Sequence, residues 1–201
     1  QRLIATGMFS KESLDFQRKV LERSGLGDET FAPPALLRSY PKPDMTMRGS
    51  RMEAEMVLFG AIDDLLERTG VQAEQIDVLV VNCGLFAPTP SLCSVVVNRY
   101  AMRADIRAFN LSGMGCSAGV VATDLARRVL NVREGALALV ITMENITQSG
   151  YSGNDRSKLL PNCIFRMGGA ACLLTSGNGR RKWAGKNAAD KKAGKNAAAP
   201  P

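Results

Sequence analysis

Apolar residues recur every three to four positions in three segments, which predicts amphipathic helices over residues 11–24, 51–69 and 117–131. In the second helix the apolar positions are Met52, Met56, Phe59, Ile62 and Leu66. Gly25 and Gly70 follow the first two helices, as is typical where a helix ends. Four prolines between positions 33 and 43 predict that residues 26–50 form a loop.

Short apolar runs over residues 76–81, 106–111, 136–143 and 170–175 predict buried strands. Ser91 is suited to cap a further helix over residues 91–102, although Val95–Val97 would also suit a strand. Strands that alternate with helices are typical of parallel βαβ units. The sequence therefore predicts an α/β layered fold.

The pattern ends near residue 176, which predicts a folded domain over residues 1–176 and a tail over 177–201. The tail contains seven basic residues and one acid, Asp190, so it carries six of the seven net positive charges of the chain. A six-residue stretch beginning at Ala184 is repeated from Ala193, and no apolar face is present. We expect this tail to be disordered, and the nearly neutral body gives no support for nucleic-acid binding.

The cysteines are five in number, show no C-x-x-C spacing and are accompanied by no histidine. We therefore expect no metal site. Free thiols in apolar surroundings fit a reducing compartment. No apolar run approaches the roughly 20 residues that span a bilayer, and no signal peptide is visible. Because the first residue is Gln1, we expect the chain to begin inside a longer protein.

Cys116 is the candidate nucleophile, because it lies between a predicted strand and a predicted helix, in the segment NLSGMGCSAG at residues 110–119. Gly113 and Gly115 permit a tight turn that exposes the sulfur. Backbone N–H groups and the dipole at the start of the helix favour the thiolate. The backbone of Gly115 and Ser117 would stabilise an oxyanion when a thioester is attacked. The alternative is that Cys116 only packs at a strand–helix junction.

The other cysteines are weaker candidates. Cys83 ends a predicted strand but has no helix start after it. We interpret Cys93, Cys163 and Cys172 as residues of the core or of a pocket wall.

Several segments, taken together and in order, resemble the plant 3-ketoacyl-CoA synthases, the condensing enzymes of very-long-chain fatty acid elongation. The resemblance runs from about Gly7 to Thr175 and is carried by residues 16–27, 80–83, 88–91, 110–119, 144–148 and 161–171. More distantly, the chain resembles type III polyketide synthases and ketoacyl-carrier-protein synthase III.

This resemblance implies a thiolase-like fold with two similar α/β halves in five layers, of which the chain holds most of the N-terminal half. It implies that Cys116 accepts an acyl group from a long-chain acyl-CoA and that malonyl-CoA is the second substrate, with no further cofactor. The pocket wall implied by the resemblance consists of Asn82, Cys83, Glu144, Thr147 and Phe165.

The resemblance also implies a homodimer with the strand before Cys116 at its seam, other elongase subunits as partners, and the endoplasmic reticulum membrane with the site facing the cytosol. The family carries two transmembrane helices upstream and its catalytic His and Asn downstream, so we expect a fragment with low or no condensing activity. The alternatives are a non-catalytic half-domain that associates with full-length enzymes, a type III polyketide synthase-like enzyme, and a protein that binds anions through its basic tail.

Overall fold

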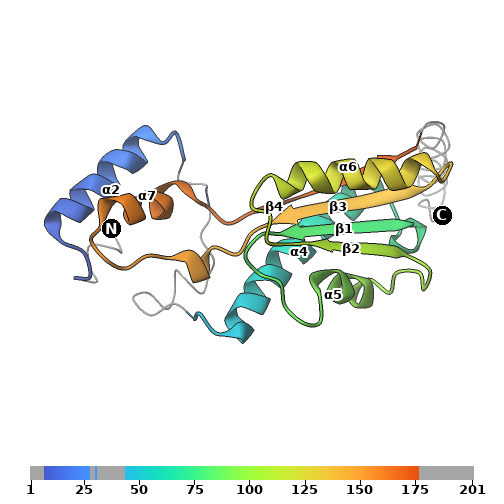
Figure 1. Cartoon of the computed structure of the whole chain (residues 1–201), viewed down its shortest axis with the longest axis horizontal. Helices are drawn as coiled ribbons and strands as arrows, with labels where there is room; N and C mark the ends of the chain where they lie inside the picture. Colours follow the sequence, from blue (N-terminus) through green and yellow to red (C-terminus); the bar gives the residue numbers. More distant parts are fainter. Residues whose placement is uncertain (1–6, 28–29, 31–43, 177–201) are drawn as a thin grey trace, which may run out of the picture. The chain divides into compact units, whose positions relative to one another are not determined.

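The computed structural model describes residues 7–27, 30 and 44–176 (Figure 1). The chain divides into two compact units, and each is described by itself. One unit comprises Gln1–Val57 with Glu144–Gly168, and the other comprises Leu58–Met143 with Gly169–Pro201. The tail predicted over 177–201 lies outside the described residues, so both its disorder and the domain boundary at residue 176 stay predictions.

The second unit is built on a four-stranded sheet in the order β2-β1-β3-β4 (Figure 1). Its strands are β1 (Val78–Cys83), β2 (Arg107–Leu111), β3 (Leu137–Met143) and β4 (Gly169–Thr175). The central strand β1 pairs in parallel with β2 and β3, and Asn82 lies in register with both Leu111 and Thr142. The carboxyl ends of three strands therefore meet at one edge of the sheet.

The fourth strand departs from the parallel pairing that is typical of βαβ units, because β4 runs antiparallel to β3. The chain leaves the sheet after Met143, passes through residues 144–168, and returns at Gly169, which pairs with Met143. A connection that returns to the end of the sheet it left must reverse the strand direction. The pattern of apolar and polar residues within a single strand does not indicate at which end of the sheet the chain returns.

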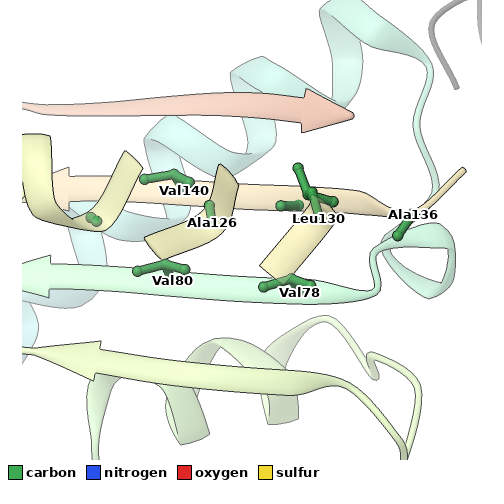
Figure 2. Packing of buried hydrophobic residues seen from close by; sticks show 8 residues of the cluster. Val78, Val80, Ala126, Leu130, Ala136 and Val140 are labelled. Carbon is green, nitrogen blue, oxygen red and sulfur yellow. The ribbon is translucent and has the colours of Figure 1, made fainter. Parts of the chain in front are cut away.

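One face of the sheet packs against α6 (Ala118–Asn131), the helix predicted after Cys116 (Figure 2). Val78 and Val80 of β1 belong to the same buried cluster as the small residues Ala122 and Ala126 of α6, and Figure 2 shows Val78, Val80 and Ala126. The rest of the cluster consists of Leu130, Ala136, Ala138 and Val140. Alanines allow the helix to approach the strands closely, and a Cβ added at Gly119 would lie only 3.3 Å from Cγ2 of Thr142.

The other face of the sheet contacts α5 (Leu92–Arg99), which lies behind the strands in Figure 2. The predicted cap is confirmed, because Ser91 Oγ accepts a hydrogen bond from Ser94 N at 3.2 Å. The alternative strand at Val95–Val97 is wrong, since all three residues lie inside α5. Leu79, Val81, Leu139 and Ile141 alternate with the α6-facing residues and are fully buried.

The amino ends of β1 and β3 are joined by Asp77. Its Oδ2 accepts a hydrogen bond from Leu137 N at 2.9 Å, and its Oδ1 lies 2.6 Å from Arg103 Nη1. Arg133 contributes a second cation at 3.4 Å. The strand predicted over 76–81 begins two residues later than predicted, at Val78. Asp77 precedes it, and its side chain makes these contacts at the amino ends of β1 and β3.

In the first unit, α2 (Lys11–Arg23) packs against α7 (Arg156–Ile164). Ser10 caps α2 through its side chain, and its backbone N–H donates to Oδ1 of Asn154 at 2.8 Å. Gly25 follows the C-cap residue Ser24 and has a φ of +72°, a value that glycine adopts without strain. The helix predicted over 11–24 is thus confirmed to within one residue.

Helix α4 (Met47–Thr69) begins four residues earlier than the sequence predicted. Thr46 starts it, because its Oγ1 accepts a hydrogen bond from Gly49 N at 3.1 Å. The last residues of the predicted loop 26–50 are therefore helical, and residues 28–29 and 31–43 lie outside the described residues. The predicted apolar face is partly wrong, since Met52 is 61% exposed while Ile62 is fully buried. In the described residues, no helix is long and apolar enough to cross a membrane.

Candidate functional site

Cys116 lies in the turn between β2 and α6 and is exposed. The turn requires left-handed backbone at two positions, and glycines occupy both, with φ +72° at Gly113 and +67° at Gly115. The helix begins two residues after the sulfur, at Ala118, with Ser117 as its N-cap residue. The predicted strand–turn–helix arrangement around Cys116 is therefore present.

The backbone of this turn leaves donors available at its surface. Ala118 N donates to Gly115 O at 3.1 Å, and Gly119 N donates to Cys116 O at 3.3 Å. Within the described part of the chain, the N–H groups of Cys116 and Ser117 donate to no acceptor. N–H groups at the start of a helix stabilise negative charge, on a thiolate or on the oxyanion of a reacting thioester.

A backbone hydrogen bond joins this turn to the carboxyl end of β1, since Gly113 N donates to Gly84 O at 3.0 Å. Two predicted pocket residues, Asn82 and Cys83, end that strand. Asn82 lies on the face that packs against α6, in the row that continues from Val78 and Val80. Cys83 lies on the opposite face and is fully buried. Asn82 thus lies on the α6-facing side of the sheet, in register with Thr142 of β3.

The side chain of Asn82 is only 5% exposed, and its Nδ2 has no hydrogen-bond partner in the described residues. A buried amide donor without a partner costs about 1–3 kcal/mol. Such groups are rare in folded proteins and often mark a functional site. Asn82 is therefore a predicted pocket residue with a buried hydrogen-bond donor that nothing in the described residues satisfies.

The other three predicted pocket residues belong to the first unit. Glu144 is half-buried and accepts a hydrogen bond from Asn145 N at 3.2 Å. Thr147 is buried, and its Oγ1 has no partner in the described residues. Phe165 follows α7 and is 55% exposed, which leaves a large aromatic surface in contact with solvent.

The remaining cysteines differ from Cys116 in their surroundings. Cys93 is buried, its thiol donates to Phe109 O at 3.0 Å, and burial raises its pKa to about 11. Burial also raises the pKa of Cys163. Cys172 is exposed on β4 and so does not belong to the core, although burial of its sulfur raises the pKa of this thiol as well. A thiol with a raised pKa is protonated and unreactive at neutral pH.

A buried acid, Glu53, was not identified as a site candidate from the sequence. It is almost fully buried, and its Oε1 accepts hydrogen bonds from Ile146 N at 2.7 Å and Thr147 N at 3.3 Å. The sequence offers one signal for its burial, namely its place next to Ala54 and four residues before Val57 on one side of a helix. No group of three or more potential metal ligands occurs in residues 7–27, 30 and 44–176.

Comparison with solved structures establishes the fold. The chain aligns with 1,3,6,8-tetrahydroxynaphthalene synthase from Streptomyces coelicolor A3(2), a bacterial type III polyketide synthase, with a TM-score of 0.63 and 20% identity. The alignment covers 81% of this chain and 47% of that chain. A mutant of CsyB complexed with CoA-SH aligns with a TM-score of 0.63 and 18% identity, covering 82% and 47% of the two chains. The fold is therefore that of a thiolase-like α/β protein, as predicted.

Sequence comparison gives the family. The model of the FAE1/type III polyketide synthase-like proteins matches residues 2–189, so the chain belongs to this family. It is 56% identical over 170 residues to 3-ketoacyl-CoA synthase 2 of Arabidopsis thaliana, covering 85% of this chain and 32% of the relative. Probable 3-ketoacyl-CoA synthase 20 of Oryza sativa subsp. japonica is 51% identical over 170 residues, again 85% of this chain and 32% of the relative. The chain spans about a third of the length of these curated relatives.

Proposed function

We propose that this chain is the nucleophile-bearing part of a 3-ketoacyl-CoA synthase that acts in very-long-chain fatty acid elongation. The observation that carries the proposal is the exposed Cys116 two residues before α6, where the N–H groups of Cys116 and Ser117 donate to no acceptor in the described residues. It lies at the carboxyl ends of parallel strands, where α/β sheets commonly bind ligands. Identity above 50% to named 3-ketoacyl-CoA synthases supports the same reaction class.

In the first step, the Cys116 thiolate attacks the thioester carbon of a long-chain acyl-CoA. The backbone donors of the turn, with Gly115 and Ser117 on either side of the sulfur, stabilise the oxyanion. Collapse of this intermediate expels the CoA thiolate and leaves the acyl group as a thioester on Cys116. Covalent catalysis of this kind divides a difficult condensation into two easier steps.

In the second step, malonyl-CoA loses CO2, and the resulting carbanion attacks the acyl thioester. The Cys116 thiolate leaves, and the product is a 3-ketoacyl-CoA with two more carbons. The 201 residues contain no histidine, so no imidazole of this chain stabilises the developing enolate. For these residues, the proposal is therefore restricted to the acyl-transfer step, with Asn82, Cys83, Glu144, Thr147 and Phe165 assigned to the pocket by the family resemblance.

The proposal also includes the family's surroundings: a homodimer, other elongase subunits as partners, and the endoplasmic reticulum membrane with the site facing the cytosol. One structural feature supports the dimer. Strand β2 lies at an edge of the sheet, and Arg107 and Ala108 on it are exposed, so its backbone is available for contact with a second copy. The same edge supports a second candidate function, in which the chain associates with a full-length condensing enzyme without catalysing the reaction.

Mass spectrometry after incubation with a long-chain acyl-CoA tests the acyl-transfer step. We expect one acyl adduct on Cys116, lost in Cys116→Ala and retained in the matched control Cys172→Ala, which removes the other exposed thiol. Equal acylation of the Cys116→Ala variant would overturn the assignment of the nucleophile. Co-elution with a full-length relative, without any acyl adduct, would favour the second candidate function.

A further inference from the structure

A buried polar cluster in the first unit is not explained by the acyl-transfer chemistry. Its members are Ser50 and Glu53 on α4, and Asn145 and Thr147 on the segment after β3. All four side chains are 3% exposed or less. Burial of a carboxylate is costly unless hydrogen bonds replace the water it loses, so this arrangement needs compensation within the cluster.

Two sets of hydrogen bonds join α4 to this segment: in one set α4 supplies the acceptor through a side chain, and in the other it supplies the acceptor through its backbone. The carboxylate of Glu53 accepts from Ile146 N at 2.7 Å and from Thr147 N at 3.3 Å. In return, Nδ2 of Asn145 donates to the backbone oxygen of Ser50 at 2.8 Å. Because Ser50 and Glu53 are three residues apart on one helix, both contacts fall on the same face of α4.

Glu53 also stands at the start of the short 3-10 helix η2 (Thr147–Ser149). Ile146 is the N-cap residue of this helix, and no side chain of the segment caps it. A carboxylate that accepts the first N–H groups of a helix satisfies donors that the helix cannot satisfy itself. Glu53 therefore supplies, from a distant part of the sequence, the cap that residues 144–149 lack.

Four polar atoms of the cluster are buried without a hydrogen-bond partner in the described residues: Ser50 Oγ, Glu53 Oε2, Asn145 Oδ1 and Thr147 Oγ1. The carboxylate and amide oxygens only accept hydrogen bonds, whereas the two hydroxyls both donate and accept. An ordered water molecule with two to four such partners is the common way in which proteins satisfy atoms of this kind.

We propose that Glu53 is a positioning residue whose carboxylate, together with Asn145, fixes the backbone of residues 144–147, and that ordered water bridges the remaining oxygens of the cluster. The segment it holds contains Glu144 and Thr147. Where the inference extends to substrate binding, it rests on the proposed function, which assigns these two residues to the acyl-CoA pocket.

Hydrogen exchange measured by NMR on the full chain tests the positioning role. The variants are Glu53→Leu, which removes the acceptor, and Glu53→Gln, which keeps one oxygen acceptor without the charge. Glu55→Gln makes the same charge change on the same helix without altering the cluster. We expect the Ile146 and Thr147 amides to exchange at least about ten-fold faster in Glu53→Leu, and at an intermediate rate in Glu53→Gln, with no change in Glu55→Gln.

Unchanged exchange at Ile146 and Thr147 in Glu53→Leu would overturn the inference. An equal acceleration of all amides of α2, α7 and residues 144–149 would also overturn it, because that result indicates general loosening of the unit. If Glu53→Leu does not fold, the Glu53→Gln variant still decides, since faster exchange confined to these two amides supports the inference. A crystal structure is expected to show water within hydrogen-bonding distance of Glu53 Oε2, and a dry cluster would overturn the water bridge.

The acylation of Cys116 supplies a readout that a purely structural role would not change. In Glu53→Gln we expect the acyl-CoA concentration for half-maximal acylation to rise several-fold while the maximal rate stays within two-fold of the unaltered chain. A lower maximal rate at an unchanged half-saturating concentration would overturn the link to the pocket. Absence of acylation in the unaltered chain would overturn the proposed function, whereas the hydrogen-exchange result would still decide the role of Glu53.

Discussion

The two ends of the parallel strands in the sheet unit differ in how completely their polar groups are satisfied. At the amino end, Asp77 binds Arg103, Arg133 and the N–H of Leu137, so charges and backbone groups are paired. At the carboxyl end, two left-handed glycines expose Cys116, and Asn82 is buried with an unpartnered Nδ2. The polar groups described at the amino end are satisfied by the protein itself, whereas Asn82 at the carboxyl end has a buried donor that the described residues leave unpaired.

The largest difference we expect between thiols is in their rates of alkylation. At pH 7.5, iodoacetamide should modify Cys116 at least about 100-fold faster than Cys93, because Cys93 is buried and its raised pKa of about 11 keeps it protonated. Peptide mass spectrometry over time measures both rates in one sample. In guanidinium chloride the two rates should converge, and equal rates in the native chain would contradict the comparison.

Removing the carboxylate at the amino end should destabilise the fold strongly. Asp77→Ala removes the acceptor of the Leu137 N–H and a carboxylate partner of both Arg103 and Arg133, and we expect a loss of about 3 kcal/mol in the free energy of unfolding. Asp105→Ala is the matched control, because Asp105 also binds Arg103 but is exposed, and it should cost less than about 1 kcal/mol. Urea unfolding followed by circular dichroism measures both. Equal effects would mean that the junction at Asp77 contributes no more than a surface ion pair.

The stability of the sheet unit should fall between about pH 9 and pH 11. In this range the unfolded chain releases the Cys93 proton while the folded chain retains it, since burial raises the pKa from 9.0 to about 11. The folded state then binds more protons, so the free energy of unfolding decreases as the pH rises, by about 2 kcal/mol over the interval. Urea midpoints at pH 8, 9, 10 and 11 measure the slope. Cys93→Ala should show a shallower slope, and an identical slope would exclude Cys93 as its source.

The smallest effect concerns the glycine in the turn. Gly115→Ala places a side chain at φ +67° with no atom within 4 Å of its Cβ, so the cost is backbone strain alone, about 1 kcal/mol. Gly60→Ala is the opposite control, because its Cβ also meets no atom within 4 Å and a helix interior favours alanine by about 0.5–1 kcal/mol. Thermal unfolding of both variants measures whether Gly115→Ala lowers and Gly60→Ala raises the stability. Destabilisation by Gly60→Ala, or none by Gly115→Ala, would contradict the assignment of strain to the turn.

The sequence by itself determined the elements whose signals are local. The helix after Cys116 was predicted because small apolar residues recur at helical spacing and two glycines precede it, and α6 begins within one residue of that prediction. Ser91 correctly marked the start of α5 because a cap acts on N–H groups two or three residues away. Gly25 and Gly70 correctly marked helix ends for the same local reason, since both have positive φ.

Only the tertiary structure decided features that depend on residues far apart in the chain. The antiparallel direction of β4 follows from where residues 144–168 return to the sheet, and no short pattern records that point. The burial of Glu53 depends on the N–H groups of Ile146 and Thr147, which lie more than 90 residues away in the sequence. Their hydrogen bonds to its carboxylate make this acid the cap of η2. The unpaired Nδ2 of Asn82 is likewise a tertiary feature, because the packing of α6 on this face of β1 buries it. An unpaired amide costs free energy only when it is buried, and residue type alone does not show burial.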